Sequence, residues 1–144
     1  MLIKEILAKK TERSVITIPP GASVKEAVDA MVGHNVGCVV VASEDQTPVG
    51  ILSERDVLRL YREHGDQLAS IRVADVMTRD LLIGAPERAV EEVMTLMTSR
   101  RFRHLPIVDG GRLVGLVSLG DLVKNRLEQT EMEAASLKQY IYTG

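Results

Sequence analysis

Aromatic residues are scarce in this sequence, which has no Trp, one Phe and three Tyr among 144 residues. Proteins that bind single-stranded nucleic acid stack the bases on aromatic side chains, and this chain has little with which to build such a platform. The formal net charge of −2 offers no basic surface for a phosphate backbone either. Nucleic acid is therefore not expected as a partner, and the core has to be built from Val, Ile, Leu, Met and Ala.

Cysteine and long apolar runs are also nearly absent. The single Cys38 excludes an internal disulfide, which fits a reducing compartment, and its apolar neighbours favour a buried structural thiol over a reactive one. The longest apolar runs, such as residues 39–42, fall far short of the ~20 residues of a membrane helix. Charges at Lys4 and Glu5 stand where a signal peptide would be apolar. We therefore expect a cytoplasmic protein without a membrane segment.

Residues that would form a catalytic centre are not apparent. His34 and His64 have no Cys or His partners at the spacing of metal ligands, so no metal site is expected. Neither glycine-rich stretch, at residue 21 or at residues 110–111, has the spacing of a phosphate-binding P-loop. No nucleophile has a base at a recognisable spacing. The composition, 45% hydrophobic and 26% charged, is typical of a soluble globular protein.

What the sequence does contain is an internal duplication. Residues 50–56 read GILSERD and residues 115–121 read GLVSLGD, with Gly, Ser and Asp at the same places. Aligning Val24 with Val90 as well requires only a slightly shorter turn in the second half. Such self-similarity indicates two copies of one structural unit.

Each half predicts the same order of elements: strand, helix, strand, strand, helix. Apolar runs predict the strands, stripes at i, i+3 and i+4 predict the helices, and Gly, Pro and Asp mark the turns. The expected elements are residues 15–18, 24–31, 36–42, 49–52 and 53–61 in the first half and 81–83, 90–97, 102–108, 113–117 and 118 onward in the second. Residues 1–13, expected to contain a short helix, and residues 71–77 lead into the two halves, and residues 63–70 connect them. Pro106 predicts that its strand is an edge strand or is irregular.

A long helix is expected after the duplication. Apart from Gly120, neither Pro nor Gly interrupts residues 118–142, which favours one long helix. An apolar stripe with alternating spacings of three and four comprises Leu127, Thr130, Ala134, Leu137 and Ile141. This amphipathic helix has to bury its stripe either on its own domain or on a second subunit. We therefore divide the chain into a first repeat at residues 1–68, a second repeat at residues 69–127 and a helical tail at residues 128–144.

The duplicated motif has a purely structural explanation. A Ser followed three residues later by Asp, directly before an apolar-periodic run, forms a capping box that satisfies free amides at a helix start. That explanation leaves the preceding Gly unaccounted for. It also leaves open why both halves use Asp, since Glu or Gln reaches back at least as well.

With these motifs the chain resembles a pair of cystathionine-β-synthase (CBS) domains of the free-standing, bacterial type. The resemblance rests on the two Gly-x-x-Ser-x-x-Asp motifs and on residues 101–109, which read RFRHLPIVD, and it covers residues 1–127. It implies a mixed α/β (α+β) fold in which two tandem βαββα repeats pack with pseudo-twofold symmetry. It also implies adenosine-containing ligands in the clefts between the repeats, and the dimerisation that is usual in the family.

The resemblance assigns the motif Asp to the ribose, because its two carboxylate oxygens suit two adjacent hydroxyl donors. The motif Ser lies beside the sugar or phosphate at a helix start, where free amides favour anions. Carried over to the second motif, the main cleft comprises Ser118 and Asp121, Arg103 and His104 as phosphate-binding cations, Leu116 beneath the base, and Ile16, Thr17, Val36 and Gly37 from the other repeat.

The first motif defines a second cleft in the same way. It comprises Ser53, Asp56 and Ile51 with Leu82, Ile83, Phe102 and Arg103 from the other repeat. Where the second half has Arg103 and His104, the first half has Gly37 and Cys38, so this cleft lacks a cation of its own. We expect it to bind ligand more weakly, to stay empty, or to use Arg103 from across the interface. Without the resemblance, the arginines of this segment form a solvated helix end and His104 is an ordinary strand histidine.

The expected function is that of a regulatory module. An adenine nucleotide, AMP first and NAD(H), ATP or S-adenosylmethionine next, binds between the repeats and shifts their packing, and a protein target that the sequence does not identify detects the change. A structural or dimerisation protein with unused clefts is the alternative. An enzyme such as a nucleotide hydrolase is a third possibility, which the lack of recognisable catalytic groups disfavours. We expect a homodimer without a catalytic cofactor.

Overall fold

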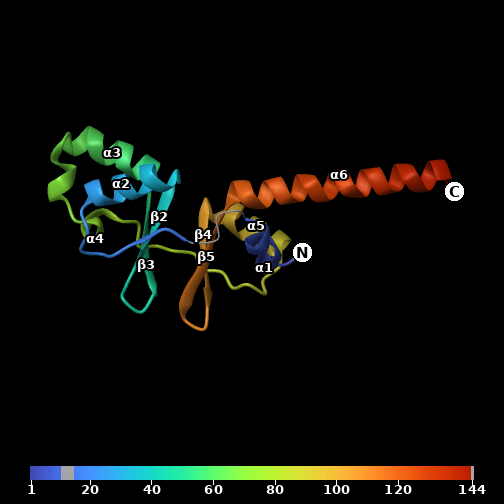
Figure 1. Ribbon diagram of the computed structural model, residues 1–144, viewed down its shortest axis with the longest axis horizontal. Helices are drawn as coiled ribbons and strands as arrows, with labels where there is room; N and C mark the ends of the chain where they lie inside the picture. The colour runs from blue at the N-terminus through green and yellow to red at the C-terminus, as the bar shows by residue number, and fades with distance from the viewer. Residues whose placement is uncertain (11–14, 144) are drawn as a thin grey trace.

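The computed structural model describes residues 1–10 and 15–143, and its elements follow the duplicated pattern (Figure 1). The polar end of the first lead-in, residues 11–13, lies outside the described residues. The elements are α1 (Ile3–Lys9), β1 (Thr17–Ile18), α2 (Val24–His34), β2 (Cys38–Ala42), β3 (Pro48–Ser53), α3 (Glu54–His64), the 3₁₀ turn η1 (Gln67–Ser70), α4 (Val73–Val76), α5 (Val90–Arg100), β4 (His104–Asp109), β5 (Arg112–Ser118) and α6 (Leu119–Thr143). The predicted mixed fold of two repeats and a C-terminal helix is confirmed.

The strands form one small sheet in each repeat. β1 pairs in parallel with β2, which pairs in antiparallel with β3, and β4 pairs in antiparallel with β5. The strand expected at residues 81–83 is replaced by one parallel bridge between Gly84 and Ile107. Gly84 donates its amide to the Pro106 carbonyl at 2.9 Å. A Cβ at Gly84 would lie 2.7 Å from Leu105 Cδ2, so only a glycine allows the chain to approach β4 this closely. The chain does not continue as a strand on either side of this bridge.

Both hairpins are irregular at matching places. The register shifts between Val41 and Ala42 in the first sheet and between Ile107 and Val108 in the second. Pro106 stays in register with Leu116, and β2 shifts at the matching place without a proline, so the missing amide hydrogen of Pro106 does not account for the shift. Strand β4 is irregular and lies in a sheet of only two strands, as the prediction of an edge or irregular strand requires.

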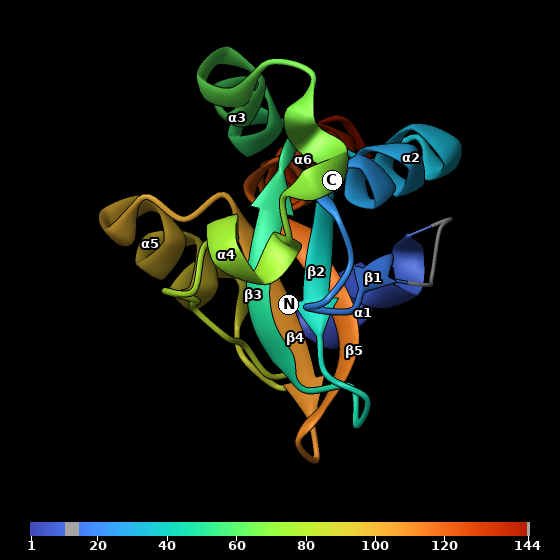
Figure 2. The same cartoon turned by 90° about the vertical axis from the view of Figure 1, so that its left-hand side faces the viewer.

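Each lead-in segment packs on the other repeat. α1 contributes Ile3 and Ile6 to the core of the second repeat, and α4 contributes Val73 to the core of the first. Figure 1 shows α1 beside α5, and Figure 2 shows α4 against β3. The Ile3 amide donates to the Arg88 carbonyl at 2.9 Å, and the Val73 amide donates to the Ala22 carbonyl at 2.8 Å. Burying each of these side chains stabilises the crossing by about 1.5–3 kcal/mol. In the sequence each lead-in segment precedes one repeat, but in the folded chain it packs in the hydrophobic core of the other repeat.

The glycine that opens each motif lies where a lead-in segment touches the sheet. A Cβ at Gly115 would lie 2.6 Å from Leu7 Cδ2 of α1. A Cβ at Gly50 would overlap the side chain of Met77, directly after α4. A larger residue would push the lead-in away from the strand, and close approach of this kind is a common reason for glycine in a strand. Packing therefore explains the residue that helix capping left unaccounted for.

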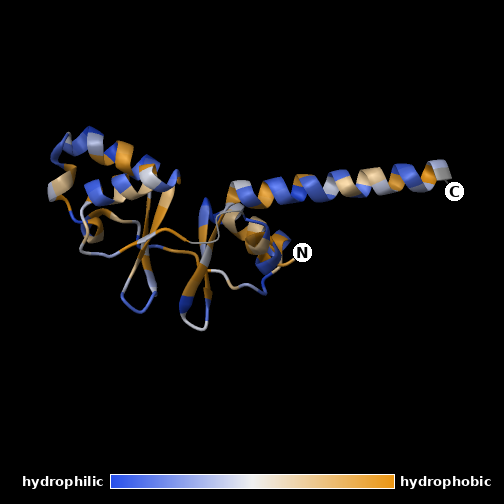
Figure 3. Cartoon of the chain, in the orientation of Figure 1, coloured by the Kyte–Doolittle hydropathy of each residue, from blue (hydrophilic) through white to orange (hydrophobic). Residues whose placement is uncertain are grey.

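The helix α6 leaves the domain after its first turns and projects alone (Figure 1). Leu122 is fully buried and Asn125 is 6% exposed, but Leu127, Leu137 and Ile141 are 59%, 60% and 65% exposed. Figure 3 shows hydrophobic residues along the projecting part. The sequence predicted that the apolar stripe is buried either on its own domain or on a second subunit, and its own domain does not bury it. Within the described residues, no helix combines the length and apolar character needed to cross a membrane.

Candidate functional site

Two cavities lie at the junction between the repeats. The main cleft, which contains Asp121, has a volume of about 600 Å³, and the second cleft, which contains Asp56, has a volume of about 290 Å³. Gly37 and His104 line both. Small-molecule sites typically measure about 300–1,000 Å³, so the main cleft has room for a nucleotide-sized ligand and the second lies at the lower limit.

Most residues predicted for the main cleft do line it. The structure brings together Ile16, Val36, Gly37, His104, Leu116, Ser118 and Asp121. Thr17 is not among the lining residues and is exposed at the start of β1, and Arg103 lines the second cleft instead. The sequence did not identify the residues that α1 and its C-terminal end contribute, namely Lys4, Leu7, Ala8 and Lys10.

The second cleft contains most of its predicted residues as well. The structure brings together Ile51, Ser53, Asp56, Phe102 and Arg103. Leu82 instead packs against the second core, and Ile83 is 47% exposed. Their places along the cleft wall are taken by Thr78, Asp80 and Leu81. The segment after α4 therefore meets the cleft slightly earlier in the chain than the resemblance implied.

Asp121 lies in the first turn of α6 and closes its capping box. Its Oδ2 accepts from the Ser118 amide at 2.9 Å, and its own amide donates to Ser118 Oγ at 3.0 Å. The same Oδ2 accepts from Lys10 Nζ at 2.9 Å. Burial alone would raise the pKa of Asp121, but the hydrogen bonds from Ser118 and Lys10 outweigh it and hold that pKa below its usual value. The predicted capping role is confirmed, and the carboxylate is ionised at neutral pH.

Asp56 closes the matching capping box at α3. Its Oδ2 accepts from the Ser53 amide at 2.9 Å and from the Ser53 hydroxyl at 3.0 Å. Its Oδ1 lies 3.7 Å from Arg59 Nη2, on a side chain that is 67% exposed, and such a pair is weak. Among the described residues, no lysine is paired with Asp56 as Lys10 is with Asp121.

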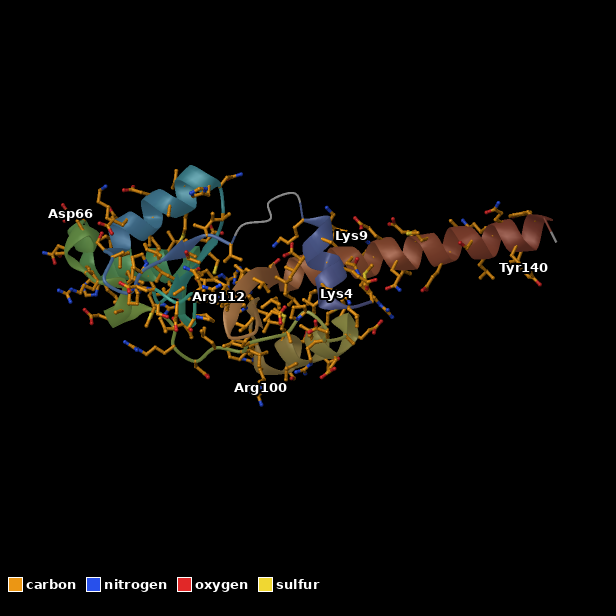
Figure 4. The ribbon with its side chains drawn as sticks, turned by 60° about the horizontal axis from the view of Figure 1, so that its bottom comes forward. Lys4, Lys9, Asp66, Arg100, Arg112 and Tyr140 are labelled. Carbon is orange, nitrogen blue, oxygen red and sulfur yellow. The ribbon has the colours of Figure 1, made fainter. Side chains whose placement is uncertain are left out.

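Lys10 bridges the main cleft from the end of α1. Its Nζ donates to Asp121 Oδ2 and, at 2.8 Å, to the Leu116 carbonyl. Figure 4 shows α1, with Lys4 and Lys9, lying close to α6. In the sequence these lysines resemble an ordinary solvated helix end. They reach the cleft only because α1 crosses to the other repeat, and sequence patterns do not reveal that crossing.

The two clefts differ in charge. The main cleft has Lys4 and Lys10 against the single carboxylate of Asp121, which leaves one positive charge in excess. In the second cleft three arginines balance three carboxylates: Arg55, Arg101 and Arg103, and Glu54, Asp56 and Asp80. An anionic ligand is therefore favoured in the main cleft.

His104, between the clefts, does not add to this charge. Burial lowers the pKa of His104, and Lys10 and Arg103 lower it further, against the opposing effect of Asp121. The imidazole is therefore neutral at pH 7 and can donate one hydrogen bond. Burial raises the pKa of the Cys38 thiol in the main cleft to about 12, which makes it unreactive. The described part of the chain contains no cluster of three or more His, Cys, Asp or Glu side chains that suits a metal ion.

A family model for the CBS domain matches residues 3–63 and residues 73–128, two copies that together span most of the chain. The chain belongs to the CBS domain family. The resemblance inferred from the duplicated motifs is confirmed. CBS domain pairs are generally regulatory modules that bind adenosyl ligands.

Individual CBS domain proteins are similar over most of this chain. A mitochondrial CBS domain-containing protein of Arabidopsis thaliana is 38% identical over 85% of the chain, which spans 61% of that relative's length. A CBS-domain containing protein of Agrobacterium tumefaciens has a crystal structure with a TM-score of 0.79 and 33% identity, covering 88% of this chain and 99% of that one. The CBS domain pair of protein MJ0100, solved with 5′-methylthioadenosine and S-adenosyl-L-methionine, shares the fold with a TM-score of 0.78 and 23% identity, over 90% and 98% of the two chains.

Proposed function

We propose that this CBS domain pair is a regulatory module that binds an adenine nucleotide in its main cleft. The observation that carries the proposal is Asp121, an ionised carboxylate at a helix start in a cleft of about 600 Å³ with excess positive charge. Its two oxygens suit the two hydroxyls of a ribose. The first amides of α6 and the ammonium group of Lys10 suit a phosphate.

AMP is the first ligand to test, followed by ATP, NAD(H) and S-adenosylmethionine. All four contain the adenosine unit that Asp121 would hold, and the MJ0100 domain pair with its two adenosyl ligands supports that choice. The excess charge from Lys4 and Lys10 favours a ligand with a phosphate over a neutral nucleoside. Binding in the second cleft would be weaker, because its volume is smaller and its charges balance.

Ligand binding would be linked to the arrangement of the repeats. The main cleft is lined by Val36 and Gly37 of the first repeat and by Ser118 and Asp121 of the second. A ligand that contacts both sides shifts the equilibrium between two arrangements by the difference in its affinity for them. We propose that a protein target in the cytoplasm detects this shift, and that the module acts as a homodimer without catalysis of its own.

A structural protein with unused clefts is the second candidate function. It is favoured by the projecting part of α6, whose Leu137 and Ile141 are 60% and 65% exposed and suit an assembly role. Thermal-shift titration separates the two functions. If none of AMP, ATP, NAD(H) and S-adenosylmethionine stabilises the protein at millimolar concentration, the structural function is favoured.

Asp121→Asn tests the proposed ribose contact. Asparagine keeps a side-chain oxygen for the helix cap but loses the charge, so AMP binding should weaken about tenfold to a hundredfold while the fold is retained. The matched variant Asp56→Asn should leave the tight AMP site nearly unchanged in isothermal titration calorimetry. Equal losses in the two variants would contradict the assignment of the main cleft.

A further inference from the structure

The projecting part of α6 carries an apolar stripe that its own domain cannot cover. Where the helix begins, the buried Leu122 and Asn125 mark the side that faces the domain. Val123 and Leu127 are 42% and 59% exposed. Because successive residues of an α-helix are separated by about 100° around the axis, these two lie on the opposite side. The stripe starts there and points away from the domain.

A helix in this position needs a partner. Most helical stability in proteins comes from packing of an apolar face and not from helix propensity alone. All side chains at residues 131–142 are exposed in the single subunit. Alternating d and a positions of a heptad repeat, the pattern of a coiled coil, are occupied by Val123, Leu127, Thr130, Ala134, Leu137 and Ile141.

Several charged residues beside the stripe have no ion-pair partner in the part of the subunit that the structure describes. In the same heptad Glu133 occupies position g, and Glu131 and Lys138 occupy position e. Among the described residues none of these three forms an ion pair, and none has an opposite charge three or four residues away along α6. Arg126, at position g, pairs with Glu91 at 3.1 Å through one nitrogen, which leaves further guanidinium donors.

We propose that the tails of two copies of this chain pair as a parallel two-stranded coiled coil. In a parallel coil, position g of one helix faces position e of the next heptad in its partner. Arg126 then faces Glu131 of the partner subunit, Glu133 faces Lys138 of the partner subunit, and symmetry repeats both pairs. In an antiparallel coil, position e faces position e of the partner and position g faces position g. Glu131 then faces Glu131 of the partner subunit, and Lys124 faces Lys138 of the partner subunit. Charge complementarity therefore selects the parallel arrangement.

This pairing does not depend on nucleotide binding, since the stripe lies outside both clefts. It does determine where the clefts lie in the dimer. Asp121 is in the first turn of α6, so a parallel coil places the main clefts of both subunits at the same end of the assembly.

Disulfide cross-linking of the full chain tests the arrangement. Leu137 occupies position d, so in the parallel coil it faces its own copy, and Leu137→Cys should form a linked dimer under mild oxidation. The matched variant Ser136→Cys, at an outward position of the same turn, should not. The buried Cys38 is common to both variants and to the wild type, which provides the background.

Two results of this experiment would overturn the proposal. If Leu137→Cys links no faster than Ser136→Cys, the stripes are not paired in parallel. If Leu137→Cys instead links to a tagged Leu127→Cys chain in a mixture, the tails run antiparallel.

Charge reversal gives an independent measurement. Glu133→Lys should weaken dimerisation about tenfold in sedimentation equilibrium, because two attractive pairs become repulsive. Adding Lys138→Glu should restore it. Glu128→Lys makes the same charge change at position b, away from the partner, and should have little effect. Equal effects of Glu133→Lys and Glu128→Lys would refute the predicted pairs.

Discussion

Replacing Lys10 by Met should tighten the binding of adenosine. Lys10 Nζ lies 2.9 Å from Asp121 Oδ2, and a ribose that uses both oxygens of Asp121 has to displace it. The two side chains are 32% and 31% exposed, and an ion pair with this exposure is worth about 0.5–1 kcal/mol. Methionine keeps most of the length of the side chain without its charge. The variant removes the cost of displacement, so the affinity for adenosine should rise about twofold to fivefold.

AMP should respond in the opposite direction. Its phosphate loses a nearby cation, and a hydrogen bond to a charged group is worth about 1.5–3 kcal/mol, more than the displaced ion pair. The net effect of Lys10→Met on AMP is a loss of about fivefold to thirtyfold. Lys4→Met is the matched control, because it removes a cation from the same cleft and leaves the partner of Asp121 in place. It should weaken AMP and leave adenosine unchanged.

Isothermal titration calorimetry of both ligands on the wild type and the two variants measures these effects. If Lys10→Met leaves adenosine binding unchanged or weakens it, Lys10 does not compete with the ribose. In that case the assignment of Asp121 to the ribose hydroxyls fails.

Two predictions concern stability. Gly50→Ala should cost about 1–3 kcal/mol in urea denaturation, because its Cβ would lie 3.1 Å from the Cβ of Met77, which a rotamer change cannot move. A Cβ at Gly33, inside α2, would have no neighbour within 4 Å, so Gly33→Ala should stabilise the protein by about 0.5–1 kcal/mol. If the two substitutions change the stability equally, crowding against Met77 is not the reason for the loss at Gly50. The pKa of His104 lies below its unfolded value of about 6.5, so the unfolded chain binds more protons and stability falls as the pH drops below that value. His104→Gln should therefore lose less stability than the wild type between about pH 7 and 5.5, and parallel stability curves would contradict this.

Local sequence patterns predicted the elements of this fold well, because short-range physics determines them. Ser23, Ser53 and Ser118 each accept from an amide three residues later, as their motifs indicate. The strand at residues 81–83 was predicted from an apolar run, and this prediction was wrong. An apolar run does not indicate how many backbone pairs a segment forms, and this segment forms only one bridge with β4, at Gly84.

The composition of the clefts was harder to predict, because it depends on contacts between distant segments. A resemblance transfers motif positions such as Asp121 directly, since they lie within one repeat. Arg103 and Leu82 lie where the repeats meet, and a shift of a residue or two decides which cleft a side chain enters or whether it joins the core. Lys10 reaches its place because α1 crosses to the second repeat, and hydrophobic periodicity contains no information about that crossing.

The crossing segments also make the two clefts unequal. Each cleft has a motif Ser and Asp at a helix start, so both present the same geometry to a ribose. Beside this shared part, Lys10 donates to the Leu116 carbonyl at 2.8 Å in the main cleft. In the second cleft the Ile51 carbonyl instead accepts from the Thr78 amide at 2.9 Å, and Asp80 follows two residues later. The crossing segment thus adds a cation to the main cleft, whereas in the second cleft it adds a carboxylate that offsets one of the three arginines. Since only the main cleft keeps an excess positive charge, its preference for an anionic ligand is determined outside the duplicated motif.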